Sequence, residues 1–408
     1  MVSINGPNSY LPQIQQSHKE KLPRELEDIV SLSRKFGLFD AVGSNRVDIL
    51  VDARDTYKKM EEAILSARHH INMEYYIFRP DKVGARFRDL LVKKAHEGVK
   101  VNFLYDAVGS RMLGWHRSFM NSLREGGIEP QDFLPLRTFT KPWNLNLRNH
   151  RKLLVVDDKI GFTGSLNIGQ KFLGEKKRGK KWRETHLMIQ GPAVTQLQWI
   201  FCEDWYFSTG EELLMPEYFR PIDQAGNEIV QVVASGPDVR EQAIHKVVFA
   251  AVSQAKKSIY LTTPYFIPDP ALYLALQVAA RRGVEVIILA PRKSDHTFVT
   301  WAGRSYYDEL LESGVKIFDY LAGNLHAKML IVDSQLTIIG SANVDIRSFD
   351  YDFEVNVQVY GETTANLASG IFFRDLKNSR DLSKTDFLHR SALKRFNENV
   401  CRLFSPVM

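Results

Sequence analysis

The pattern HxKxxxxDxxxxxxGSxN occurs twice in this chain of 408 residues, and its residue types are suited to phosphodiester chemistry. The first copy contains His150, Lys152, Asp157, Gly164, Ser165 and Asn167, and the second contains His326, Lys328, Asp333, Gly340, Ser341 and Asn343. One HxKxxxxD can arise by chance, but two copies that are each followed by the same GSxN cannot plausibly do so. The sequence therefore predicts one site built from two copies of a motif.

Two imidazoles and two ammonium groups suit transfer at phosphorus with no metal ion and no other cofactor. Residues i and i+2 of a strand point to one face, so the histidine and lysine of each motif should reach the same spot. One neutral histidine attacks phosphorus, the other donates a proton to the leaving oxygen, and a phosphohistidine forms. The lysines neutralise the non-bridging oxygens. We also expect phosphate contacts from Ser165, Asn167, Ser341 and Asn343.

Four acidic residues accompany the motifs. Glu184 in ETHLMIQG and Glu354 in FEVNVQVYG occupy corresponding places, and we expect them to orient the histidine rings. Asp157 and Asp333 stand at strand ends before turns, which favours holding the turn over direct proton transfer. The residues alone leave open which histidine attacks.

The elements that position these residues are also repeated. Residues 62–81 and 250–269 each read as the end of a helix followed by an apolar strand. A second helix, at about 84–97 or 271–282, ends at a glycine, and an apolar strand follows directly. Near-continuous apolar strands that alternate with helices indicate a sheet covered on both faces.

We therefore expect an α/β fold of two tandem domains related by a pseudo-two-fold axis, with mixed sheets flanked by helices. Residues 1–40 form an N-terminal segment, 41–225 the first domain and 226–408 the second. The motif regions are 145–172 and 321–348. The duplicated domains should pack through like surfaces, so that the two motifs face each other.

The composition of 44% hydrophobic and 25% charged residues is typical of a globular protein. The length of 408 residues is enough for two domains with a core each. The net charge of +6 is compatible with an anionic partner, either nucleic acid or a membrane surface. The two cysteines, Cys202 and Cys401, form neither a zinc motif nor a disulfide framework. We expect no signal peptide and no transmembrane helix.

From about residue 45 onward the chain resembles the phospholipase D superfamily, which is defined by paired HKD motifs, and within it the bacterial cardiolipin synthases. The resemblance rests on NHRKLLVVDDKIGFTGSLNIG, WRETHLMIQGPAV, DAVGS at 106–110, GSANVDIRSF continuing to DFEVNV, and RLFSP. It implies that two phosphatidylglycerol molecules condense to cardiolipin and glycerol. It also implies that the His, Lys and Asp of both motifs are the active-site residues, and it favours His150 as the nucleophile.

The expected enzyme is a peripheral protein on the cytoplasmic face of a bacterial membrane; its oligomeric state is open. Three segments could select lipid: a basic loop at 171–183, an aromatic and basic approach at 133–150, and a C-terminal helix with Leu393 and Phe396 on its apolar face. Each has a second interpretation, a solvated loop for the first and packing on the body for the others.

Two other activities use the same chemistry. A phospholipase D-type hydrolase would differ only in using water as the acceptor. A nuclease of this kind is expected to have a long basic groove with stacking aromatics, and usually a smaller chain that carries a single motif and dimerises. The tandem chain with its apolar, aromatic approach segment argues against it.

Overall fold

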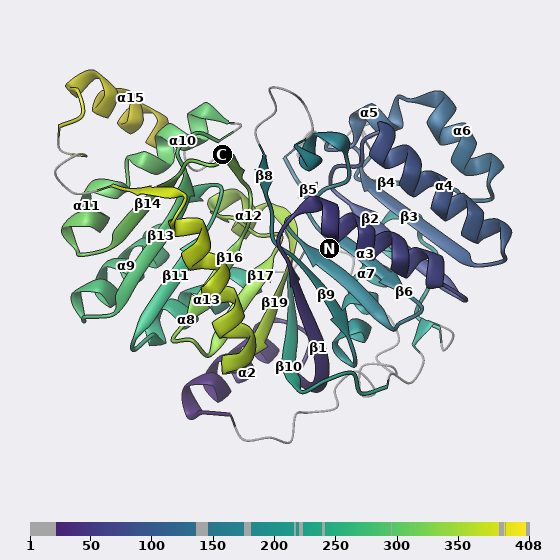
Figure 1. Cartoon of the computed structure of the whole chain (residues 1–408), viewed down its shortest axis with the longest axis horizontal. Helices are drawn as coiled ribbons and strands as arrows, with labels where there is room; N and C mark the ends of the chain where they lie inside the picture. Colours follow the sequence, from purple (N-terminus) through teal and green to yellow (C-terminus); the bar gives the residue numbers. More distant parts are fainter. Residues whose placement is uncertain are drawn as a thin grey trace.

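The computed structural model describes residues 22–135, 146–174, 181–215, 218–219, 223–238, 241–294, 296–382, 387 and 389–404. A broad twisted sheet runs through the molecule, and helices cover both of its faces (Figure 1). The α/β prediction of two tandem units is confirmed. The predicted approach segment falls largely, and the basic loop partly, outside the described residues.

The helices are α2 (Arg24–Phe36), α3 (Ala53–Ser66), α4 (Lys82–His96), α5 (Arg111–Gly114), α6 (Arg117–Glu125), α7 (Ala193–Thr209), α8 (Ala243–Gln254), α9 (Pro270–Arg281), α10 (Thr297–Arg304), α11 (Tyr307–Glu312), α12 (Ile346–Asp350), α13 (Glu362–Leu376) and α15 (Ala392–Arg402), with a 3₁₀ turn at Gln170–Leu173.

The strands are β1 (Val42–Leu50), β2 (His70–Tyr75), β3 (Lys100–Asp106), β4 (Gln131–Phe133), β5 (Arg148–Asn149), β6 (Lys152–Val156), β7 (Ile160–Gly164), β8 (Trp182–Arg183), β9 (His186–Gln190), β10 (Glu228–Ser235), β11 (Ser258–Thr262), β12 (Phe266–Ile267), β13 (Glu285–Pro291), β14 (Lys316–Tyr320), β15 (Asn324–Leu325), β16 (Met329–Val332), β17 (Leu336–Gly340), β18 (Val344–Asp345), β19 (Asp352–Tyr360) and β20 (Ser379–Asp381).

The local signals explain where the repeated helices begin and end. Asp81 accepts backbone N–H bonds from Val83 and Gly84 at the start of α4, and Asp269 caps α9 in the same way. Gly98 and Gly283 follow these helices with φ of +88° and +89°, a conformation that favours glycine. The two units therefore share their helix boundaries as well as their motifs.

The strand order shows the pseudo-two-fold symmetry directly. Reading across the sheet, β14-β13-β11-β16-β17-β19-β10 is followed by β1-β9-β7-β6-β2-β3-β4, which is the corresponding order reversed. The axis passes between β1 and β10, which pair antiparallel with Val42 opposite Val230. The two units thus form one continuous sheet.

The buried side chains also cross the boundary between the units. On one face of the sheet, α7 contributes Leu197 and Ile200 and α13 contributes Ala368 and Phe372 to a single apolar cluster. On the other face, the first unit packs α3 and α4 in one cluster, and the second packs α8 and α9 in another. The expectation of one core for each domain is therefore incomplete, because one of the layers is shared.

Candidate active site

Short cross-unit strand pairs bring each motif histidine to the other half of the molecule. β5, just before His150, pairs in parallel with the start of β19, and β15, just before His326, pairs in parallel with β8. The His150 backbone N–H donates to Phe353 O at 2.9 Å, and the His326 N–H donates to Arg183 O at 2.8 Å. His150 is thereby held next to Phe353, which directly precedes Glu354 of the second unit. His326 is held next to Arg183, which directly precedes Glu184 of the first unit.

The imidazole–carboxylate pairs consequently cross between the units. His150 Nδ1 lies 2.8 Å from Glu354 Oε1, and His326 Nδ1 lies 2.9 Å from Glu184 Oε2. Both carboxylates are buried, while each imidazole keeps about 10% of its side-chain surface exposed. A carboxylate on Nδ1 fixes the ring and leaves Nε2 for chemistry. Both glutamates were predicted to orient the histidines. Their position within each repeat did not reveal that each glutamate contacts the histidine of the other repeat.

Burial sets the protonation of the two rings. It lowers the pKa of His150 to about 4, with the charges of Lys152 and Lys328 acting in the same direction and Glu354 opposing them. Burial lowers the pKa of His326 in the same way. Burial alone would raise the pKa of Glu354, but His150 and Lys152 bring it down to about 2. The resting site therefore holds neutral imidazoles against ionised carboxylates.

The two lysines lie beside their histidines, as the i, i+2 spacing predicts. Lys328 Nζ is 3.1 Å from His326 Nε2, and Lys152 Nζ donates to the His150 carbonyl. The histidines do not lie within regular strands, because β6 begins at Lys152 and β16 only at Met329. Burial lowers the pKa of Lys152 to about 7. Each lysine lowers the pKa of the other unit's histidine as well as that of its own, so the motifs share one electrostatic environment.

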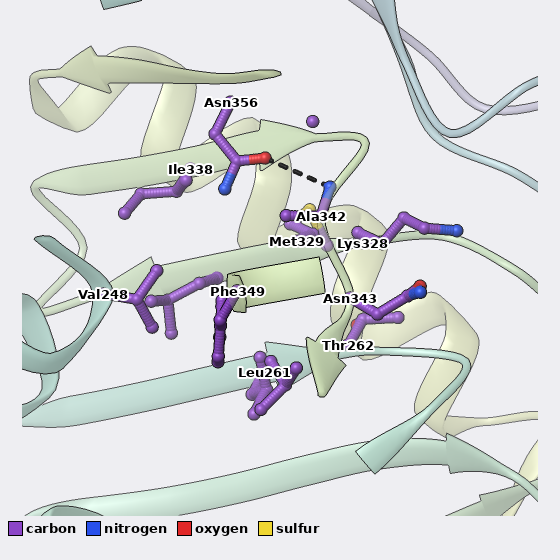
Figure 2. Close-up of a pocket in the computed structure, with 13 residues that line it drawn as sticks. Val248, Leu261, Thr262, Lys328, Met329, Ile338, Ala342, Asn343, Phe349 and Asn356 are labelled. Atoms are coloured by element: carbon purple, nitrogen blue, oxygen red, sulfur yellow. Dashed lines mark hydrogen bonds between the residues drawn. The ribbon is translucent and has the colours of Figure 1, made fainter. Parts of the chain in front are cut away.

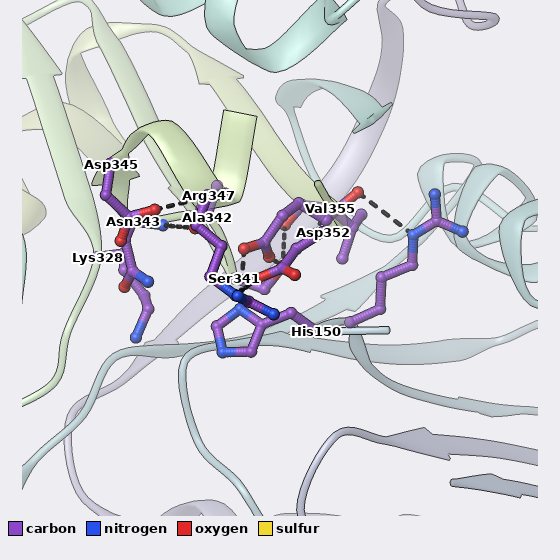
Figure 3. A network of polar contacts seen from close by, with 12 residues as sticks. His150, Lys328, Ser341, Ala342, Asn343, Asp345, Arg347, Asp352 and Val355 are labelled. Carbon is purple, nitrogen blue, oxygen red and sulfur yellow. Dashed lines mark hydrogen bonds and ion pairs between the residues drawn. The ribbon is translucent and has the colours of Figure 1, made fainter. Parts of the chain in front are cut away.

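The GSxN residues serve the glutamates as well as facing the site. Ser341 Oγ donates to Glu354 Oε2, and Ser165 stabilises the ionised form of Glu184. Figure 3 shows His150, Ser341 and Asp352 converging, with Lys328 and Asn343 to one side. Both serines are fully buried, so in the structure their hydroxyls contact protein groups. Their contact with phosphate stays a prediction.

The two motif asparagines differ. Asn167 Oδ1 accepts the Ile77 backbone N–H at 3.1 Å and so anchors the loop after β2. Asn343 Oδ1 is buried with no hydrogen-bond partner among the residues that the structure describes. Asn343 and Lys328 lie on the same side of a small pocket whose other residues include Val248 and Ile338 (Figure 2). The amide oxygen of Asn167 is therefore used within the protein, whereas that of Asn343 is left without a partner among the described residues.

The motif aspartates lie at the far ends of β6 and β16 from the imidazoles. Asp157 accepts three backbone N–H bonds of 2.7–2.9 Å from residues 68–70, and Asp333 accepts three of 2.6–2.8 Å from residues 256–258. Both occupy a hairpin turn with positive φ, +52° and +54°. Asp157 lies five positions after Lys152 along the strand, roughly 16 Å away. This geometry supports the turn-holding role over proton transfer.

Two buried arginines escaped the sequence analysis. Arg151 Nη1 donates to both Asp204 oxygens at 2.6 Å, and its Nε donates to the Glu354 carbonyl. Arg183 Nε donates to Asp375 at 2.9 and 3.0 Å, and its Nη1 to the Glu184 carbonyl. Each arginine thus fixes the backbone of one orienting glutamate. A signal existed, since the two aspartates occupy corresponding places in IFCEDW and IFFRDL.

Aromatic rings and a third acid complete the surroundings. The Tyr76 ring packs edge-on against His150 with centroids 4.8 Å apart, and Trp182 packs likewise on His326 at 5.5 Å. Among the described residues, His150, Asp352 and Glu354 place ligand atoms within 4.8 Å of one another, a geometry that could hold a metal ion. The imidazole and the Glu354 carboxylate in this group already bond each other.

Comparison with known proteins places the chain in a family. A family model described as "Cardiolipin synthase, PLD-like domain" matches residues 60–205 and 248–376, one span in each unit. The cardiolipin synthase of Geobacillus thermodenitrificans is 40% identical over 393 residues, which is 95% of this chain and 78% of that protein. Cardiolipin synthase 2 of Bacillus cereus is 41% identical over 409 residues, covering 100% of this chain and 78% of that protein.

A solved structure of low sequence identity has the same fold. The phosphatidylserine synthase of Haemophilus influenzae is 14% identical with a TM-score of 0.71, and the match covers 93% of this chain and all of that one. The family model and the curated relatives, together with the paired motifs, thus define an enzyme of the phospholipase D type, a phosphatidyltransferase. Within that class, the chain belongs to the cardiolipin synthase family. No helix within the described residues is both long and apolar enough to cross a bilayer.

Proposed function

We propose that this enzyme joins two phosphatidylglycerol molecules into cardiolipin and glycerol through a covalent phosphatidyl-histidine. The family supplies the cardiolipin synthase activity and phospholipid substrates. The observation that carries the mechanism is the pair of crossed His–Glu contacts, because they hold two imidazoles by Nδ1 and leave both Nε2 atoms for chemistry.

In the first half-reaction we assign attack to His150. Its Nε2 forms a bond to the phosphorus of the first lipid, and the bond from phosphorus to the headgroup glycerol oxygen breaks. His326 donates the Nε2 proton that this oxygen takes up, and glycerol leaves. No described residue hydrogen-bonds His150 Nε2, whereas Lys328 lies 3.1 Å from His326 Nε2. The Nε2 lone pair of His150 is therefore open for attack on phosphorus, which supports His150 as the nucleophile and leaves the acid role to His326.

His326 must take up its proton from solvent when the substrate binds, because burial lowers its pKa in the resting site. A phosphodiester carries a negative charge, and a nearby negative charge raises the pKa of an imidazole. Lys152 and Lys328 neutralise the non-bridging oxygens as the charge develops. Asn343, with its unused amide oxygen, is placed to bind a headgroup hydroxyl.

The second half-reaction reverses these roles. A headgroup hydroxyl of the second phosphatidylglycerol gives its proton to His326, its oxygen bonds to phosphorus, and the bond from phosphorus to His150 Nε2 breaks. Water in place of this hydroxyl gives phosphatidic acid, the product of a hydrolase. We place the reaction on the cytoplasmic face of the membrane with the enzyme bound peripherally.

The test uses purified full-length protein and phosphatidylglycerol vesicles, with cardiolipin, phosphatidic acid and glycerol measured. We expect cardiolipin and glycerol in equal amounts, activity that survives a chelator, and a base-stable phosphoramidate on His150 after quenching. His150→Gln should abolish all three products. The exposed His96→Gln is the matched control and should leave them unchanged. Phosphatidic acid alone would establish the hydrolase, and cleavage of single-stranded DNA without lipid turnover would overturn the lipid assignment.

A further inference from the structure

The apolar side of α15 faces solvent. Leu393, Phe396 and Leu403 are 70%, 64% and 79% exposed, and Val400 and Phe404 are exposed as well. The spacing of 393, 396, 400 and 403 places these side chains in one stripe along the helix. A surface helix of a globular protein normally turns such a stripe inward. We call Leu393, Phe396, Leu403 and Phe404 the α15 patch.

The opposite side of α15 is fixed to the body by charged groups. Glu398 is fully buried and accepts from Arg390 Nε at 2.7 Å, with Arg304 Nε 3.7 Å away. Arg390 also pairs with Asp308 at 2.6 Å. Rolling the helix to bury its stripe would separate buried Glu398 from Arg390 and Arg304, which is costly. The packing therefore holds the apolar side outward.

The pseudo-two-fold symmetry supplies a second exposed apolar patch. α5 follows β3 as α10 follows β13, and both helices display large apolar side chains. Met112 and Trp115, at α5, are exposed, Trp115 by 72%; we call them the α5 patch. In the other unit, exposed Phe298 on α10 lies 5.8 Å from the Phe404 ring, which joins α10 to the α15 patch.

The two patches flank the active site along one edge of the molecule. Figure 1 shows α10 and α15 on one side, α5 on the other, and β5 and β8 between them. β5 and β8 are the segments that hold His150 and Glu184. A single flat partner that touched both patches would therefore also lie over β5 and β8, the segments beside the paired histidines.

Charge indicates the nature of this partner. Exposed Lys394 and Arg395 border the α15 patch, and exposed Arg111 and Arg117 border the α5 patch. Tryptophan beside cations is the composition that favours a membrane interface with anionic headgroups. We propose that the α15 and α5 patches together dock the enzyme on an anionic bilayer and hold the paired histidines at headgroup level. The inference rests on the proposed lipid substrate and identifies the surface that reaches it.

The test compares three variants for binding to vesicles of phosphatidylglycerol and phosphatidylcholine, and to vesicles of phosphatidylcholine alone. The α15 variant is Leu393→Ser with Phe396→Ser and Leu403→Ser, and the α5 variant is Trp115→Ser. The control, Leu274→Ser with Val278→Ser, removes two exposed apolar side chains of α9. We expect the α15 variant to bind anionic vesicles roughly tenfold more weakly or worse, the α5 variant several-fold more weakly, and the control unchanged.

Activity on short-chain phosphatidylglycerol dispersed below its micellar concentration separates docking from catalysis. Both patch variants should retain it while losing activity on vesicles, with unchanged thermal unfolding. Undiminished vesicle binding by the two patch variants overturns the docking surface, even if the wild type makes cardiolipin. So does a shift from dimer to monomer in sedimentation of the α15 variant, which would show a second copy covering the patch. Patch-dependent vesicle binding without lipid turnover keeps the docking surface and rejects the proposed function.

Discussion

Replacing Glu354 by glutamine tests the crossed pairing of histidines and glutamates. In the unsubstituted protein His150 Nδ1 lies 2.8 Å from Glu354 Oε1. The amide of glutamine has the shape of the carboxylate, and its oxygen still accepts a hydrogen bond from His150 Nδ1. Ser341, whose hydroxyl donates to the other oxygen, has an alternative acceptor in the Val355 carbonyl at 3.3 Å. The substitution therefore removes a charge and leaves the packing in place.

The lost charge matters most when His150 becomes cationic on binding phosphorus. At about 4 Å and an effective dielectric constant of about 20, a carboxylate stabilises that cation by about 4 kcal/mol. The remaining neutral hydrogen bond returns about 1 kcal/mol. The net loss of about 3 kcal/mol corresponds to a decrease in kcat of roughly 150-fold.

The assay combines turnover on phosphatidylglycerol vesicles with ¹⁵N imidazole shifts of labelled protein. Glu354→Gln should move the His150 resonances more than those of His326, and Glu184→Gln should do the reverse. Glu285→Gln, which removes a partly exposed partner of Lys316, is the control and should change neither. A larger shift at His326 than at His150 in the Glu354 variant, or a loss of kcat below about fivefold, would refute the reasoning.

Three further predictions concern pH and stability. kcat/KM should fall below about pH 4, because His150 gains a proton and loses its nucleophilic lone pair. It should also fall above about pH 7, because Lys152 loses its charge. A decrease in kcat/KM that begins only near pH 10 would contradict the effect of burial on Lys152. Asp157→Asn keeps the tolerance for positive φ but offers one acceptor oxygen instead of two, so it should cost about 1–3 kcal/mol in denaturant unfolding with little change in kcat per folded molecule. Asp375→Asn leaves buried Arg183 without its counter-charge and should cost about 3–5 kcal/mol in the same measurement; a cost below 1 kcal/mol would show that the pair is unimportant.

The sequence predicted the repeated helices and strands because their signals are local. The predicted helices at 84–97 and 271–282, each ending at a glycine, lie within two residues of the observed bounds of α4 and α9. Asp157 and Asp333 were predicted to hold turns because they follow an apolar strand, and the backbone bonds they accept come from nearby β2 and β11. Arg151 was missed, since the corresponding places of Asp204 and Asp375 mark the acids, whereas no local pattern shows that Asp204 pairs with a buried arginine between His150 and Lys152.

The sequence by itself determined the fold class, the duplication and the chemical groups of the site, because these depend on residue type, spacing and near neighbours along the chain. Only the tertiary structure decided which groups meet. The antiparallel pairing of β1 with β10 joins the two units into one sheet, and the short β5–β19 and β8–β15 pairs then carry each histidine into the opposite unit. The physical reason is that backbone hydrogen bonds between strands far apart in sequence are nearly independent of side-chain identity, so no residue pattern within one repeat records that Glu354 holds His150 and Glu184 holds His326.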